Sequence, residues 1–381
     1  MSAEERAGLP VIGTGAETRW ADHARWRGAV RRATLPGGLP VWVVAGYDEV
    51  AGLLADPRLS LDKQHSSGGY AGFALPPALD RNLLNMDGDE HIRVRRLAAP
   101  AFTRRSAAAL RDTVSRIAES AFAALPGDET VDVLARLCVP IPAVVIGELL
   151  GVPADLHNRL RHAADAMVTL DPSSSESARR LRDSIGWMVA TFTELIGAKR
   201  AEPGDDLLSG WIRARDDEDR LSEDELVSLA FLMMMAGLEN AVHLCGNAIA
   251  AALTDDPIRD WAAQRARMTA RANPAPFAIR RFATEDLPLG DVLVPCGDTV
   301  LLSLFGADSD PARDGRPSLL FGRGPHYCLG AQVGNLIVDA VVPELFTRFP
   351  GARLAIPESA LRYRNSWRSH GLEALPVVLG R

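Results

Sequence analysis

The chain has 381 residues, of which 47% are hydrophobic and 24% charged, and its formal net charge is −7. These proportions are typical of a folded soluble protein and exclude a disordered or collagen-like chain. The acidic balance argues against nucleic-acid binding, and four scattered cysteines are too few for a disulfide framework, so we expect a cytoplasmic protein. At about 150 residues per domain, the length allows two or three domains or one large helical unit.

Strands are predicted at a few places only. Residues 40–47 read as a short strand, and residues 291–306 as two strands around a Pro-Cys-Gly-Asp turn. A closing strand is predicted within residues 372–380. Residues 60–80 are rich in Gly, Pro and Ser, and a loop of this length in a compact protein is usually functional or mobile.

Helical spacing of apolar residues covers most of the remaining chain. It predicts helices over residues 106–124, 142–150 and 176–200. No stretch of linker composition divides the chain. We therefore expect a mainly α fold with small β-sheets, forming one domain over residues 1–381.

The strongest helix prediction begins at Leu221-Ser222, where Ser222 forms a capping box with Glu225, and continues for about 30 residues. Its composition also fits a membrane span. However, Glu239, Asn240 and His243 lie near its middle, where lipid would penalise them. Since the N-terminus has no apolar run either, we expect no membrane segment and interpret the helix as a buried spine with a site at its centre.

Residues 321–330, Phe-Gly-Arg-Gly-Pro-His-Tyr-Cys-Leu-Gly, place Cys328 in a glycine-rich loop directly before an apolar helix. Loop amides and the helix dipole favour a thiolate there, which suits a nucleophile or a soft metal ligand. The glycine spacing is wrong for a dinucleotide fingerprint, and no second Cys or His stands at zinc spacing.

Six residues of this loop resemble the haem-binding loop of the cytochrome P450 superfamily, bacterial soluble type: Phe321, Gly322, Gly324, His326, Cys328 and Gly330. The resemblance implies a cytochrome P450 fold around haem b, with Cys328 as the axial thiolate ligand of the iron. It implies that His326 meets a haem propionate. The alternative for Cys328 is a buried cysteine with a purely structural role.

The resemblance extends over nearly the whole chain. Residues 85–102 look like the family's C-helix entry, where His91 and Arg95, spaced i and i+4, would bind propionates. Without the resemblance, this segment would be read as a solvated basic helix face. Arg281 matches a further propionate-binding arginine.

The centre of the long helix resembles the family's oxygen-activation segment, Ala-Gly-x-Glu-Thr. By this resemblance Ala236 and Gly237 lie beside the haem, Gly237 opens the helix, and Glu239 helps deliver protons. Asn240 stands where the family has threonine, and an amide does not relay protons as a hydroxyl does. Asn240, His243 or the substrate would then complete the relay.

Two other departures concern the K-helix region and the approach to the cysteine. The family's Glu-x-x-Arg pair falls on Met268 and Arg271, so Arg271 needs another partner or must reach solvent. The segments 255–268 and 310–321 are short for the family, which trims the side that normally docks an electron donor.

The resemblance also implies a substrate pocket with a mostly apolar lining, for a hydrophobic or mixed polyketide- or peptide-like product. The residues expected to line it are Met233, Met234, Phe277, Ala278, Ile279 and Trp367. Core packing is the alternative for each of these residues. Ferredoxin with its reductase would deliver electrons at a basic patch of Arg93, Arg96, Arg104, Arg105 and Arg323.

Three functions follow from these patterns. The favoured one is a haem-thiolate monooxygenase that oxidises a specialised metabolite, as in antibiotic biosynthesis, by hydroxylation or an unusual cyclising reaction. The second is a catalytically silent protein of the same fold that stabilises a partner such as a glycosyltransferase. The third is a haem-dependent catalyst that needs no external electrons.

Overall fold

The computed structural model describes residues 11–12, 19–67, 75–99, 104–127, 129–168, 175–216, 221–254, 258 and 260–380. The chain forms two compact units, each assembled from three segments. The first unit comprises Met1–Arg93, Ala275–Cys328 and Asn365–His370, and the second comprises Val94–Pro274, Leu329–Arg364 and Gly371–Arg381. Because the units interleave along the sequence, no single linker separates them. One domain over residues 1–381 stays a prediction.

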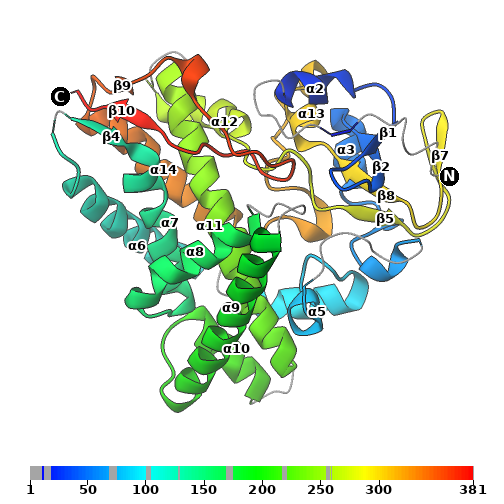
Figure 1. The fold of residues 1–381 in the computed structure, drawn as a ribbon, viewed down its shortest axis with the longest axis horizontal. Helices are drawn as coiled ribbons and strands as arrows, with labels where there is room; N and C mark the ends of the chain where they lie inside the picture. Colours follow the sequence, from blue (N-terminus) through cyan, green and yellow to red (C-terminus); the bar gives the residue numbers. More distant parts are fainter. Residues whose placement is uncertain are drawn as a thin grey trace. The chain divides into compact units, whose positions relative to one another are not determined.

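A five-stranded sheet carries the first unit (Figure 1), with strand order β1-β2-β8-β5-β3. Its strands are β1 (Arg31–Thr34), β2 (Pro40–Val44), β8 (Thr299–Leu302), β5 (Arg281–Ala283) and β3 (Leu59–Ser60). β2 and β8 are parallel, and the other neighbours are antiparallel. The strand expected at 40–47 and the pair expected within 291–306 are confirmed, although β7 (Val292–Val294) pairs with β6 (Leu287–Leu289) as a separate hairpin.

The parallel pair is buried on both faces, which explains its continuous apolar sequence. Side chains alternate along a strand, so Val41 and Val43 pack with Leu301 in one core, while Trp42 and Val44 belong to the core on the other face. Short helices complete this unit: α2 (Arg19–Arg25), α3 (Tyr47–Leu53), α4 (Pro77–Asp80) and α13 (Leu304–Asp308).

The predicted loop at residues 60–80 is partly regular. The 3₁₀ helix η1 (Lys63–His65) and α4 lie within it, and Lys63 forms an ion pair with Asp80 at 2.5 Å. Residues 68–74 lie outside the described residues.

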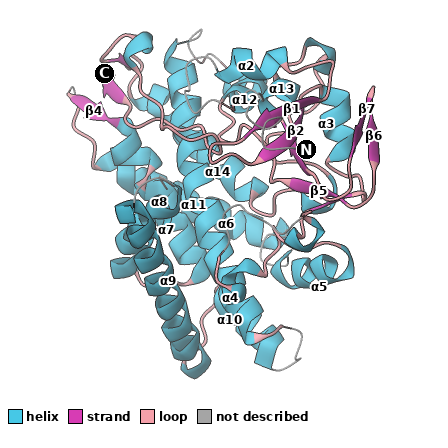
Figure 2. Cartoon of the chain, turned by 45° about the vertical axis from the view of Figure 1, so that its right-hand side comes forward, coloured by secondary structure: helices cyan, strands magenta, loops and turns pink. Residues whose placement is uncertain are grey.

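Helices dominate the second unit, as the cyan ribbons of Figure 2 show. They are α6 (Arg104–Ala123), α7 (Pro140–Leu150), α8 (His157–Val168), α9 (Ser175–Ala201), α10 (Leu207–Asp216), α11 (Glu223–Thr254), α12 (Trp261–Arg271) and α14 (Ala331–Arg348). A three-stranded sheet, β4 (Thr130–Asp132), β10 (Pro376–Val378) and β9 (Arg353–Leu354), has the order β4-β10-β9. The helices predicted over 106–124, 142–150 and 176–200 and the closing strand are confirmed. The helix α5 (Gly88–Ala98) begins in the first unit and ends in the second.

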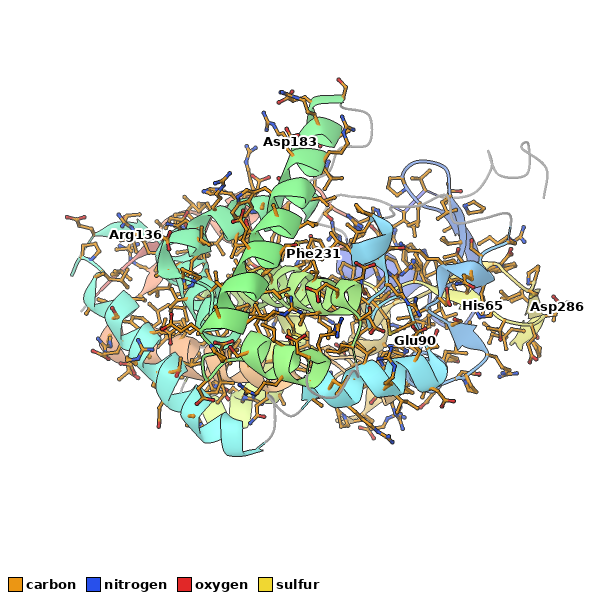
Figure 3. All side chains as sticks on the ribbon, turned by 90° about the horizontal axis from the view of Figure 1, so that it is seen from below. His65, Glu90, Arg136, Asp183, Phe231 and Asp286 are labelled. Atoms are coloured by element: carbon orange, nitrogen blue, oxygen red, sulfur yellow. The ribbon has the colours of Figure 1, made fainter. Side chains whose placement is uncertain are left out.

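The helix α11 is the spine of the second unit and packs against α7, α8, α9, α10, α12 and α14. Its capping box is present: Ser222 N donates to Glu225 Oε2 at 2.7 Å, and Glu225 N donates to Ser222 Oγ at 3.1 Å. It is long and apolar enough to cross a membrane, but 67% of its most apolar window is buried within the protein. In Figure 3 Phe231 of α11 lies inside the unit, whereas Arg136 and Asp183 project outward. The helix therefore has the burial of a core helix.

Candidate active site

The loop that carries Cys328 is a tight turn, held by its own backbone. Gly322 and Gly324 have φ angles of 71° and 74°, in the left-handed region that favours glycine. Cys328 N donates to Phe321 O at 2.9 Å, which closes the loop. A Cβ on Gly324 would lie 2.8 Å from the Cβ of Ala55, so this glycine also permits close packing against the end of α3.

Cys328 is exposed at the end of this loop, two residues before Gly330, the N-cap of α14. Its position near a helix N-terminus lowers the free energy of a thiolate. The other cysteines differ in setting. Cys138 and Cys245 are buried, and a hydrogen bond with Cys245 together with burial raises the pKa of the Cys138 thiol well above its usual value. Cys296 is exposed, and its thiol donates to Thr284 O at 3.3 Å.

Asp87 anchors His326 from a distant part of the first unit. Its Oδ1 accepts from His326 Nε2 at 2.8 Å, and its Oδ2 accepts from Ser60 Oγ at 2.6 Å and Leu61 N at 2.6 Å. Desolvation opposes ionisation, but these hydrogen bonds and the His326 charge outweigh it and lower the pKa of Asp87. The sequence places Asp87 just before α5, but nothing in its spacing links it to a residue 239 positions away.

His91 and Arg281 are buried in the same unit. The His91 ring, 2% exposed, lies 4.1 Å from the His326 ring, measured between centroids. Arg281 is 4% exposed and donates to Leu54 O at 3.2 Å and Leu59 O at 3.5 Å. Burial lowers the pKa of Arg281 to about 10, although the charge of Asp87 raises it.

These residues fit an anionic group. Arg281 Nε and His326 Nδ1 are buried and have no hydrogen-bond partner among the residues that the structure describes. A buried cation with an unused donor is costly, and a carboxylate would satisfy both its charge and its donor. The first unit thus combines an exposed thiol with buried donors suited to propionates. Arg95, half-buried, follows His91 by one turn of α5 but belongs to the second unit.

The second unit holds the residues predicted for oxygen activation, on α11. The helix is continuous through Gly237, so the expected helix opening is absent. Instead, a Cβ on Gly237 would lie 3.0 Å from Ile146 Cδ1, so the glycine allows α7 to approach closely. Asn240 is exposed and donates from Nδ2 to Ala236 O at 3.0 Å, one turn back on its own helix. The Glu239 side chain is 20% exposed.

His243 is the polar residue that approaches Glu239. Its Nε2 lies 3.3 Å from Glu239 Oε1, and its side chain is 2% exposed. The signal for this contact in the sequence is the i, i+4 spacing on one helix. Met268 is 1% exposed, and Arg271 is exposed, so the second of the two outcomes expected for Arg271, access to solvent, is present.

The residues predicted to line a substrate pocket divide between the units. Phe277 is 6% exposed and lies in an aromatic cluster with His23, Trp26 and Trp367, and Ile279 is 42% exposed. Met233 and Ala278 are half-buried. Their role at a substrate stays a prediction. The arginines expected at a docking patch are exposed at Arg93, Arg96 and Arg323, and the side chains of Arg104 and Arg105 lie outside the described residues.

Known proteins resemble this chain over nearly its whole length. The vitamin D(3) 25-hydroxylase of Pseudonocardia autotrophica is 33% identical over 371 residues, which cover 92% of this chain and 91% of that protein. The tirandamycin C-bound P450 monooxygenase TamI is 34% identical with a TM-score of 0.84, covering 96% of this chain and 97% of TamI. PksS, the cytochrome P450 of the bacillaene polyketide synthase of Bacillus subtilis 168, is 26% identical with a TM-score of 0.86, covering 97% and 99%. No family model matches the chain. These relatives favour an enzyme over the silent auxiliary protein.

Proposed function

Because this chain belongs to the cytochrome P450 superfamily, we propose that Cys328 holds the iron of haem b and that the enzyme oxidises a specialised metabolite. The chain is a cytochrome P450-type oxidoreductase, and its family implies haem, a small-molecule substrate and redox partners. When bound, a thiolate-ligated haem supplies the activation of dioxygen.

The observation that carries the proposal is the Cys328 loop together with the donors of its unit. The glycine turn presents the Cys328 thiol at the surface of the first unit. His326 precedes Cys328 by two residues, and its imidazole is held by a hydrogen bond to Asp87. We assign binding of the propionates to His91, Arg281 and His326, and to Arg95 on the same helix as His91. Charge-assisted hydrogen bonds of this kind are shorter and stronger than neutral ones, so they would orient the group.

On α11, Ala236 and Gly237 would pass beside the haem, and Glu239 would supply protons from the solvent side, since its carboxylate is partly exposed. Asn240 has one N–H engaged with Ala236 O. We assign its carbonyl oxygen and second N–H to orienting a water molecule or the substrate. In this assignment the amide orients groups and does not relay protons.

The substrate we propose is a hydrophobic natural product such as a polyketide. Two relatives support this class: one is bound to tirandamycin C, and the other serves a polyketide synthase. The apolar side chains proposed as the lining are Met233, Phe277, Ala278, Ile279 and Trp367. We further propose that ferredoxin and its reductase supply electrons, and that the protein works in the cytoplasm without membrane attachment.

The deciding experiment is the absorption spectrum of the purified protein with dithionite and carbon monoxide. We expect the band of a thiolate-ligated ferrous carbonyl. Cys328→Ala should abolish this band, while Cys296→Ala, which removes the other exposed cysteine, should leave it unchanged. An unchanged band in the Cys328 variant would refute the ligand assignment.

The same preparation separates the remaining hypotheses. A folded, colourless protein that takes up no added haem would contradict the enzyme assignment and favour the auxiliary role. Turnover of a bound substrate with and without a ferredoxin system then tests the electron source, because activity without any donor would support the third hypothesis.

A further inference from the structure

The buried His243 of α11 has no assigned contact in the proposed function, although it is one of three candidates for the missing proton relay. His243 lies one helical turn beyond Glu239, and its side chain is 2% exposed. Neither ring nitrogen has a hydrogen-bond partner among the described residues, and the same holds for Glu239 Oε1. A buried polar group without a hydrogen bond is costly, and each one in a folded protein calls for a reason.

The nearest charged partner shown for the His243 ring is Glu239. Nε2 and Oε1 are 3.3 Å apart, which is within ion-pair reach although the pair does not meet hydrogen-bond geometry. The two side chains stand at i and i+4, the spacing at which helical neighbours meet.

The backbone at Gly371 limits where the ring can go. A Cβ added at this position would lie 1.9 Å from His243 Nδ1 and 2.2 Å from Cε1. The imidazole therefore fills the space that any other residue at 371 would need. This close packing holds Nδ1 toward the Gly371 segment, while Nε2 lies by Glu239.

Asn240 does not compete for the same carboxylate. Its Nδ2 donates to Ala236 O at 3.0 Å, and its side chain is exposed. At the centre of α11, His243 is thus the side chain shown within reach of Glu239.

We propose that His243 is a positioning residue for Glu239. It holds the carboxylate of the proton donor in one rotamer by donating from Nε2, a task that Asn240 does not perform. This inference rests on the proposed function only for its catalytic consequence, because the contact itself exists within the second unit.

The contact is tested by nitrogen-15 NMR of the protein labelled at histidine, in its oxidised, substrate-free form. Glu239→Gln should shift the His243 ring resonances. His157, whose Nε2 bonds to Val152 O at 2.9 Å, serves as the internal control and should not move. Unchanged His243 resonances in the Glu239 variant would overturn the proposal.

The catalytic consequence is measured as product formed per electron pair consumed, with peroxide release followed in parallel. We expect His243→Leu to lower this ratio about ten-fold with little change in KM, and His243→Gln to recover part of it. Asn247→Ala is the control, since it removes another buried polar side chain of α11, one that donates to Ala272 O. This variant should form as much product per electron pair as the wild type. Wild-type coupling in His243→Leu would overturn the proposal.

Failure of the proposed function has a different signature. A protein that forms no thiolate-ligated carbonyl would remove the catalytic assignment of Glu239. The NMR comparison would still decide whether His243 and Glu239 interact.

Discussion

Replacing Asp87 by asparagine should weaken the fold by a predictable amount. In the wild-type protein, Oδ2 accepts from Ser60, Leu61 and Asp62, and Oδ1 accepts from His326. An asparagine can place its carbonyl oxygen at the Oδ2 position and keep the first three bonds. Its amide nitrogen then faces His326 Nε2, so the substitution removes one charge-assisted bond.

A hydrogen bond to a charged group contributes about 1.5–3 kcal/mol. The Asp87 side chain is 32% exposed, so solvent screening favours the lower end of this range. We therefore expect Asp87→Asn to lower the free energy of unfolding at pH 7 by about 1.5 kcal/mol. Urea denaturation followed by circular dichroism measures this difference.

The pH dependence gives a second test with a definite sign. Hydrogen bonds from His326, Ser60 and Leu61, acting against desolvation, lower the pKa of Asp87 below its usual 3.8. A carboxylate with a lowered pKa stabilises the folded state above its ordinary pKa and loses this contribution as the pH falls through its folded value. The gap between wild type and Asp87→Asn should therefore narrow below about pH 4.

Asp62→Asn is the matched control, because the Asp62 side chain caps η1 by accepting from Gln64 N at 2.9 Å, while its bond to Asp87 comes from the backbone N–H and is kept. Asparagine caps equally well, so the control should stay within about 0.5 kcal/mol of wild type. Two results would show that the hydrogen bond between His326 and Asp87 does not stabilise the fold as proposed. One is a loss of unfolding free energy in Asp87→Asn no larger than in Asp62→Asn. The other is a stability difference between wild type and Asp87→Asn that persists below about pH 4.

Two further predictions concern the first unit. Burial, with the charges of Arg19 and His370, lowers the pKa of His23 from 6.5 to about 3, so the unfolded chain binds a proton that the folded one does not. Stability should fall by about 1.7 kcal/mol between pH 6.5 and 5. His23→Asn, which can keep the bond to Ser303, should flatten this loss in urea titrations. Gly324→Ala should lower the free energy of unfolding by more than about 2 kcal/mol, of which about 1 comes from the positive φ and the rest from the clash with Ala55. Gly322→Ala has the positive φ without the clash and should cost only about 1 kcal/mol. Equal melting temperatures of the two variants would contradict this prediction.

The helices could be predicted because their signals are local. The apolar spacing predicted a helix over 176–200, and α9 spans Ser175–Ala201. The capping box located the start of α11. The five-stranded sheet could not be assembled in the same way, because β3 has only two residues and its partner β5 lies more than 200 positions away. Short strands depend on tertiary pairing more than on their own composition.

In the candidate site, too, the features with a local sequence signal could be predicted and the long-range contacts could not. The Cys328 loop is a contiguous motif, so its turn could be read from residue spacing. The hydrogen bond from His326 to Asp87 joins segments that are far apart in the sequence, so it could be found only in the folded structure. At Gly237 the sequence resemblance predicted an opened helix, but α11 is continuous there. The glycine instead leaves space for the side chain of Ile146 of α7.

The different exposure of the four cysteines allows thiol modification to report unfolding of the protein. Cys138 and Cys245 are buried, whereas Cys296 and Cys328 are exposed. A bulky maleimide would therefore modify two thiols in the folded protein and all four in the unfolded chain. Mass spectrometry of the adducts then counts molecules that have opened, without any dye or introduced label. Bound haem would shield Cys328 as well, so the number of adducts would also distinguish a loaded molecule from an empty one.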